Sequence, residues 1–309
     1  MFARTAAAAL ALVAVFATWE ARAQEKLTLG YTNLSQNSLD FVAQELGYFK
    51  DEGLDVSLVS TSGTSTLVPT LVSGSLQIAT VPPPILLQSA NSGLGLVAIT
   101  GLSELDPKAN DTALIRRAGT PALMPDDIKG KRLAVSTIGS ISQILLDDWL
   151  HRRGVDSASV TYVEVPFSQM QTVLKQGTVD AALMPEPFLT ATLQAGDGAL
   201  ESYFLADLPR GIPGMINIAD ATWAHAHADT IARFRRALDR AATYSQAHPT
   251  EVKQILGKWL KLPPKVMDLT AVPIPRASVA PKDLAWWLDL MKGQKIVDQP
   301  LDPAALTLP

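Results

Sequence analysis

The chain contains no cysteine. This absence excludes disulfide bonds, thiolate metal sites and a lipid-anchored N-terminal cysteine. The chain is also poor in charge, because only 18% of its 309 residues are charged, the formal net charge is -4 and no basic stripe stands out. Nucleic acid is therefore not expected as a partner. Stability must come from packing alone, and the length suffices for one large α/β domain or two lobes.

Catalytic motifs are missing as well. The sequence has no HExxH, no GxSxG, no Walker loop and no GxGxxG. Among its four histidines, His225 and His227 form an H-A-H pair, which is a weak metal signal because residues two apart face different sides of a helix. We therefore expect a solvated histidine pair, no metal, no cofactor and no enzymatic activity.

The first 23 residues have the layout of a secretory signal peptide. Arg4 precedes an apolar run from about Ala6 to Ala17, and Ala21-Arg22-Ala23 supplies a small-x-small cleavage site. The run is shorter than the ~20 helical residues that cross a bilayer, which favours a cleaved signal over a membrane anchor. No Arg-Arg pair precedes the run, which favours the ordinary export route. We expect a periplasmic protein that begins at Gln24.

Strand and helix patterns alternate through two successive runs. Strand patterns at 27–31, 54–59 and 76–80 are separated by helical periodicity, and the same order restarts with strand patterns at 133–135, 160–165 and 179–184. The alternation predicts mainly parallel sheets with helices on both faces. The shared order predicts two similar α/β lobes. Beyond Pro213, one long helix is predicted from Thr222 to Ala247, with a solvated arginine face.

Five loops follow these strand patterns, at 32–37, 61–65, 81–84, 137–142 and 184–188. In open α/β sheets such loops hold ligands. Three of them are rich in Ser, Thr, Asn and Gly, which place hydroxyls and free N–H groups at helix N-termini and favour an anion. Each loop taken singly fits an ordinary cap or turn. Two such loops at equivalent places in the two lobes favour a ligand-binding role over ordinary caps and turns.

Three segments carry a family resemblance: LGYFKDEGLDVSLV, GKRLAVSTIGSISQILLDDWLHRRGV and GTVDAALMPEPF. They resemble the extracytoplasmic solute-binding proteins of the nitrate, sulfonate and taurine family, which serve ABC importers and are similar to thiamine-precursor-binding proteins. The resemblance implies a type II periplasmic binding protein fold, with two α/β lobes joined by a two-strand hinge. Lobe 1 would comprise 24–111 plus 213–309, and lobe 2 would comprise 112–212.

The resemblance further implies capture of a small polar solute, organic or inorganic, between the lobes and delivery to an ABC-importer permease. We expect the solute to be anionic and the protein to be a monomer. The loops and the matching motifs together predict these ligand-binding residues: Asn33, Ser35, Ser62, Gly63, Thr64, Ser65, Pro82, Pro83, Thr137, Gly139, Ser140, Pro185, Glu186 and Arg210.

Two of these residues give information about the chemical class of the ligand. Pro185 stands where sulfonate-binding relatives often carry Trp, which counts against a sulfonate. Arg210 is a candidate counter-ion for a carboxylate, with a solvated arginine as the alternative. Two other function classes stay open. One is an enzyme on the same fold, of the menaquinone-pathway or pyrimidine-precursor type, and the other is a sensor module that presents its ligand to a membrane receptor.

Overall fold

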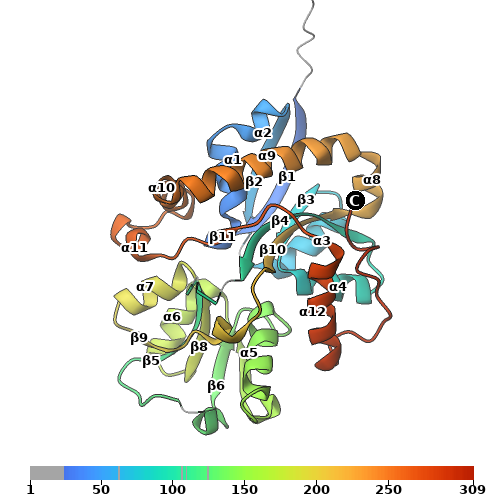
Figure 1. Ribbon diagram of the computed structural model, residues 1–309. Coiled ribbons are helices and arrows are strands. Elements are labelled where there is room, and N and C mark those ends of the chain that lie inside the picture. Colours follow the sequence, from blue (N-terminus) through green and yellow to red (C-terminus); the bar gives the residue numbers. More distant parts are fainter. Residues whose placement is uncertain (1–23, 62, 106, 109, 124) are drawn as a thin grey trace, which may run out of the picture.

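The protein folds into two lobes, each built around one β-sheet with helices on both faces (Figure 1). The computed structural model describes residues 24–309 apart from 62, 106, 109 and 124. The predicted signal peptide, residues 1–23, and Ser62 lie outside the described residues. The two-lobed α/β fold expected from the sequence is confirmed. Within the described residues, no helix has the length and apolar character to cross a membrane.

Lobe 1 contains a six-stranded sheet of order β11-β4-β10-β3-β1-β2. Its strands are β1 (Glu25–Thr32), β2 (Leu54–Thr61), β3 (Ile78–Val81), β4 (Leu96–Leu105), β10 (Ile212–Asp220) and β11 (Ile274–Pro275). Strand β1 pairs in parallel with β2 and β3, whereas β10 runs antiparallel to both β3 and β4.

Lobe 2 contains a five-stranded sheet of order β7-β6-β8-β5-β9. Its strands are β5 (Thr112–Arg117), β6 (Arg132–Val135), β7 (Thr161–Glu164), β8 (Ala181–Pro185) and β9 (Gly198–Ser202). Strand β6 pairs in parallel with β7 and β8, whereas β5 is antiparallel to β8 and β9.

Both sheets are mixed, so the expectation of mainly parallel sheets is wrong. The reason lies in the two crossings of the chain between lobes. Strand β5 begins just after the first crossing, with Thr112 paired to Pro185 at the end of β8, and β10 begins just after the second, with Ile212 paired to Leu105 at the end of β4. Each crossing strand therefore leaves the junction while its neighbours run toward it.

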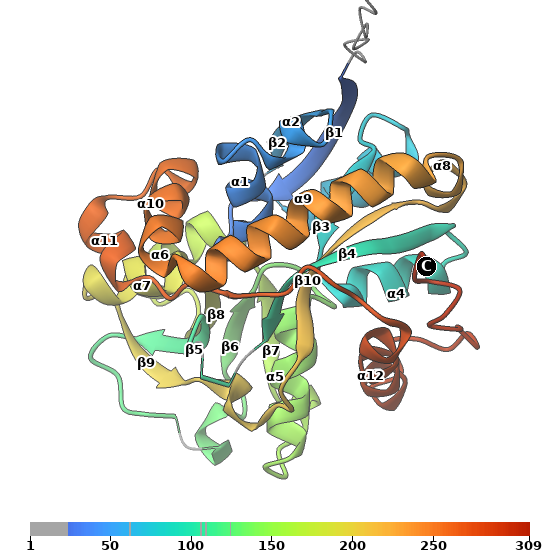
Figure 2. The same ribbon diagram turned by 45° about the horizontal axis from the view of Figure 1, so that its top comes forward.

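Helices cover both faces of each sheet (Figure 2). In lobe 1, α1 (Ser38–Glu45), α2 (Tyr48–Asp51), α9 (Ala228–Ala247) and α10 (Pro249–Leu260) share one apolar core, and α3 (Leu67–Val72) and α4 (Pro83–Asn91) pack on the other face. In lobe 2, α5 (Ile141–His151) covers one face, and α6 (Phe167–Lys175) and α7 (Phe188–Gln194) cover the other.

The predicted helix from Thr222 to Ala247 is interrupted. Helix α8 (Ala221–Ala226) ends at His227, whose backbone leaves the helical conformation. Both the backbone N–H of His227 and its Nδ1 approach the Trp223 carbonyl oxygen, at 3.0 and 2.8 Å. The histidine thus closes α8, and α9 starts directly after it.

The arginines of α9 form a solvated face only in part, because Arg236 and Arg240 are exposed whereas Arg233 and Arg235 are partly buried. Arg235 donates to the carbonyl oxygens of Ile99 and Leu308 at 2.8 and 2.7 Å, and Arg233 forms an ion pair with Glu25. These contacts join α9 to the start of β1, to β4 and to the C-terminal end of the chain.

Two further helices complete the chain, α11 (Pro264–Leu269) and α12 (Pro281–Gly293). Helix α12 contacts α4 of lobe 1 and lies beside α5 of lobe 2 (Figure 1). Just beyond it, Gln294 donates from Nε2 to the carbonyl oxygen of Ile144 in α5 at 2.8 Å. The C-terminal region therefore touches both lobes.

Candidate functional site

A small cavity of about 60 Å³ lies at the junction of the two lobes. It is formed where β4, β8 and the starts of β5 and β10 meet, opposite the first turn of α5. The residues that line it are Leu34, Gln36, Leu105, Thr112, Ile141, Ser142, Leu145, Phe167, Pro185, Leu205, Gly214 and Met215.

The cavity wall is predominantly apolar. Gln36, Thr112 and Ser142 are its only polar side chains among the described residues, and none of its lining residues is charged. Gln36 donates from Nε2 to Asp111 Oδ2 at 3.2 Å, which orients its amide. Apolar walls with a few placed polar groups are typical of small-molecule sites. The cavity is smaller than the 300–1,000 Å³ or so of such sites, so a larger ligand requires the lobes to move apart.

One end of the cavity carries hydrogen-bond donors. Ile141 and Ser142 are the first residues of α5, whose first N–H groups have no carbonyl partner within the helix. Ser140, the residue before the helix, is 6% exposed, and its Oγ has no hydrogen-bond partner among the described residues. A helix N-terminus carries about half a positive charge, so this end suits an anionic or strongly polar group.

The turn before α5 favours glycine. Gly139 has φ +76°, in the left-handed region, and its N–H donates to Gln143 Oε1 at 2.7 Å. Its carbonyl oxygen accepts a hydrogen bond from Gln88 Nε2 of lobe 1 at 2.8 Å. The turn is thus held in shape from both sides and links the lobes.

Glu186 is engaged by protein donors rather than facing the cavity. Its carboxylate accepts from the Thr190 hydroxyl at 2.7 Å, from the Thr190 N–H at 3.1 Å and from the Ala271 N–H at 3.4 Å. Burial raises the pKa of the Glu186 carboxyl, and the hydrogen bonds from Thr190 oppose that rise. Its carbonyl oxygen accepts from Ser35 of lobe 1 at 3.4 Å. Glu186 therefore joins the lobes.

A buried polar cluster lies near the cavity, in lobe 1. Asp40 of α1 is fully buried and accepts from Thr80 Oγ1 of β3 and Asn217 Nδ2 of β10, both at 3.1 Å. Thr80 Oγ1 also lies 2.7 Å from Asn217 Oδ1. Burial raises the pKa of Asp40 to about 7, against the lowering effect of these two hydrogen bonds.

The structure places the predicted site residues unevenly. Pro185 lines the cavity, and Ser35 and Ser140 are buried next to lining residues. Pro82 and Pro83 are buried at the start of α4. The others do not line this cavity: Gly63, Thr64, Ser65, Asn33, Thr137, Gly139, Glu186 and Arg210.

Asn33 and Arg210 are both exposed, and Asn33 Oδ1 accepts from Ser60 at 3.1 Å. Most lining residues, such as Leu105, Leu145 and Phe167, were not predicted from the sequence, although others lie in the predicted loops 32–37 and 137–142. Their apolar character is the same as that of core residues. The only signal was their position, at strand ends and in first helical turns. Among the described residues, no group of three His, Asp or Glu side chains is placed to hold a metal ion.

Comparison with known proteins identifies relatives across most of the chain. A family model described as NMT1/THI5 like matches residues 36–252. The chain is 26% identical over 239 residues to a protein of Haemophilus influenzae named for thiamine biosynthesis, covering 75% of this chain and 73% of that one. It is 27% identical over 247 residues to the bicarbonate transport ATP-binding protein CmpC of Synechocystis, covering 75% of this chain but 37% of CmpC.

Solved structures share the fold. The alkanesulfonate-binding protein SsuA of Xanthomonas axonopodis, bound to MOPS, superposes with a TM-score of 0.79 at 18% identity, covering 92% of this chain and 98% of that one. The nitrate-binding protein NrtA of Synechocystis superposes with a TM-score of 0.75 at 17% identity, covering 91% and 84%. The resemblance expected from the sequence is confirmed at the level of fold and family. Since its model matches more than half of the residues, the chain belongs to the NMT1/THI5-like family.

Proposed function

We propose that the protein is the extracytoplasmic solute-binding component of an ABC importer and captures a small organic anion between its lobes. The observation that carries the proposal is the cavity at the lobe junction, with the N-terminus of α5 at one end and apolar side chains around the rest. The negative group of the ligand would meet Ser140 and the first N–H groups of α5. Its apolar body would pack on Leu105, Phe167 and Met215.

This proposal refines the ligand class expected from the sequence. Burying an apolar group contributes about 25 cal/mol per Å², so an anion with an apolar body gains from walls that a bare inorganic anion would leave unused. Nitrate or bicarbonate would leave those walls facing water. The fold similarity to SsuA and NrtA supports a binding role. The ligands named for SsuA and NrtA are ligands of those proteins, and they do not identify the ligand of this chain.

The two lobes, 24–111 plus 213–309 and 112–212, are the proposed moving units. In this conformation the lobes already touch through Ser35 with Glu186 and Gln88 with Gly139. A ligand that contacts both lobes would stabilise this closed arrangement, which the permease would then recognise. Export through a cleaved signal peptide would place the protein in the periplasm.

Charge-matched variants of Gly139 test the anion site. Aspartate and asparagine have nearly the same shape and both tolerate the left-handed backbone, so only the charge differs between Gly139→Asp and Gly139→Asn. An added Cβ would lie 3.5 Å from the Gln88 amide, which is ordinary contact. We expect Gly139→Asp to bind the ligand about fivefold or more weakly than Gly139→Asn, because a like charge a few Å away costs about 1 kcal/mol or more.

The ligand would first be found by thermal shift on protein that starts at Gln24, with each organic carboxylate and sulfonate paired with its neutral amide. A ligand at 100 times its dissociation constant adds about 2.7 kcal/mol of stability. Calorimetric titration of both Gly139 variants then follows. Equal affinities in the two variants, or equal shifts with acid and amide, would contradict an anionic ligand.

The rival classes separate by what happens to the bound ligand. The THI5 name also covers enzymes, and an enzyme would release a changed molecule, whereas a binding protein returns the ligand intact in mass spectrometry. A sensor would bind equally well but would not support uptake. Uptake of labelled ligand by vesicles that contain the cognate permease distinguishes import from sensing.

A further inference from the structure

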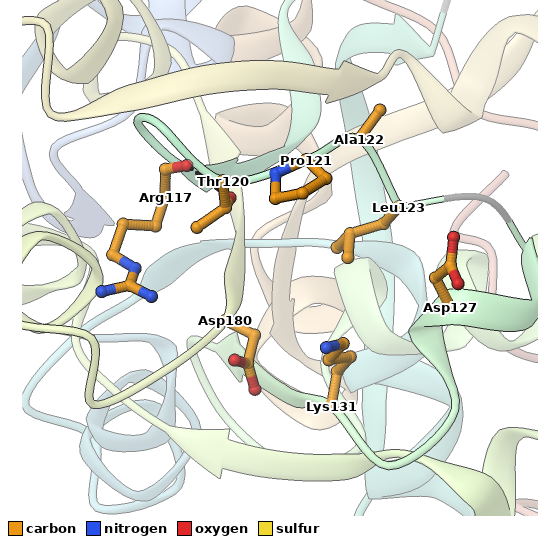
Figure 3. A pocket seen from close by; sticks show the side chains of 8 residues that line it. All are labelled: Arg117, Thr120, Pro121, Ala122, Leu123, Asp127, Lys131 and Asp180. Carbon is orange, nitrogen blue, oxygen red and sulfur yellow. Dashed lines mark hydrogen bonds between the residues drawn. The ribbon is translucent and has the colours of Figure 1, made fainter.

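A second, larger pocket of about 330 Å³ lies at the far end of lobe 2 (Figure 3). Arg117 ends β5, whereas Thr112 at the other end of that strand lines the junction cavity. Lys131 and Asp180 come just before β6 and β8, at the ends of these strands that lie away from lobe 1. The pocket and the junction cavity therefore lie at opposite ends of the strands of lobe 2.

The pocket is large enough for a ligand as it stands. Small-molecule sites typically enclose about 300–1,000 Å³. One wall is the segment Thr120, Pro121, Ala122 and Leu123, which offers apolar side chains beside the charged ones. Figure 3 shows Leu123 pointing into the space between Arg117, Asp180 and Lys131.

The charges around the pocket are unequally satisfied. Asp180 accepts the backbone N–H of Arg132 at 2.8 Å and lies 3.9 Å from the Arg132 guanidinium. The side chains of Arg117 and Lys131 form neither a hydrogen bond nor an ion pair with any of the described residues. Two cations without anionic partners among the described residues therefore line the same space, whereas Asp180 and Asp127 are both already engaged.

We propose that this pocket binds a small carboxylate with a short apolar group, at a site distinct from the junction cavity. The planar guanidinium of Arg117 matches a carboxylate with two parallel hydrogen bonds, and Lys131 adds a point charge. The apolar group packs on Leu123 and Pro121. Asp180 and Asp127, which also line the pocket, disfavour ligands with a second negative charge.

The proposal does not depend on the function assigned to the junction cavity. Its test uses isobutyrate as the probe and isobutyramide as the neutral control, followed by heteronuclear NMR on the protein from Gln24. We expect isobutyrate to shift the Ala122 amide and the Leu123 methyl signals in a saturable manner, and isobutyramide to leave them unchanged.

Two variants locate the site. Arg117→Gln should weaken isobutyrate binding about tenfold or more, because it removes the charged pair of donors that the carboxylate would accept from. Lys129→Gln is the matched control, because Lys129 lies on the neighbouring turn, pairs with Asp126 at 2.8 Å and does not line the pocket. It should keep wild-type affinity. Arg117 is exposed, so its replacement leaves the core intact.

Gly139→Asp separates this site from the junction cavity. Isobutyrate shifts at Leu123 should persist in that variant whatever happens to ligand binding between the lobes. The proposal is overturned if no saturable shift occurs at Leu123 and Ala122, if the amide binds as well as the acid, or if Arg117→Gln behaves like Lys129→Gln. Shifts confined to Ile141 and Ser142 would likewise overturn it, by placing the probe between the lobes.

Discussion

Replacing Asp40 with asparagine should remove a large part of the pH dependence of stability. Asp40 is fully buried and its pKa is raised from 3.8 to about 7 by that burial. Between roughly pH 4 and pH 7 the unfolded chain has lost this proton and the folded protein keeps it. The stability contributed by the protonated form is fully present at low pH and is lost as pH rises toward 7.

The hydrogen-bond geometry explains why the protonated form of the Asp40 carboxyl is favoured in the buried cluster. Thr80 has one hydroxyl proton but lies within reach of two acceptors, Asp40 Oδ2 and Asn217 Oδ1. A protonated Asp40 can donate to Thr80, which donates to Asn217, whose amide donates back to Asp40 Oδ1. An asparagine at position 40 can form the same closed ring without carrying a charge.

The expected magnitude follows from linkage. One group contributes about 1.4 kcal/mol per pH unit across the window between its two pKa values, so the total reaches about 4 kcal/mol. We expect Asp40→Asn to match the wild type near pH 4 and to exceed its free energy of unfolding by up to about 4 kcal/mol above pH 7.

Urea unfolding followed by tryptophan fluorescence, repeated from pH 4 to pH 8, measures this difference. The comparison cancels every other titrating group, provided that the groups do not couple to Asp40. Asp55→Asn, at an exposed position of β2, is the control and should leave the wild-type curve unchanged. Parallel curves for wild type and Asp40→Asn would refute the reasoning.

Two further substitutions probe packing within lobe 1. Gly101→Ala would place a Cβ 2.5 Å from the Ser278 carbonyl oxygen and closer still to that of Arg276, so we expect the free energy of unfolding to fall by about 1–3 kcal/mol. Gly95→Ala is the control, because a Cβ at Gly95 meets open space. Equal melting temperatures for the two variants would contradict the clash at Gly101. Trp287→Phe removes the hydrogen bond from Nε1 to the Pro213 carbonyl oxygen and should cost about 1–3 kcal/mol, because that buried acceptor loses its partner. Trp286→Phe should cost less, since Trp286 is only partly buried, and the reverse order would argue against the hydrogen bond.

The fold could be predicted from the sequence because its signals are local. Alternating strand and helix patterns appear within windows of a few residues, and they located β1, β2, β6 and β8 and the helices between them. Repetition of that order indicated two lobes. Strand direction was not a local signal, because it depends on where the chain re-enters a sheet after crossing between lobes. That is why the sheets are mixed.

The candidate site shows the same division between local and tertiary information. The Gly139-Ser140 turn was visible in the sequence, since a left-handed position and a helix start depend on neighbouring residues. Glu186 was visible as a motif, but only the packed lobes show its carboxylate held by Thr190 and Ala271.

The apolar lining of the junction cavity was decided by tertiary structure alone. Leu34 lies in the predicted loop 32–37, but its apolar side chain, like those of Leu105 and Phe167, has the same character as core residues and does not mark a cavity. Whether such a side chain fills the core or borders a space depends on what packs against it from the other lobe. The residues across the cavity lie far away in the chain, as Met215 does from Leu34, so the sequence carries the chemistry of the wall but not the space it encloses.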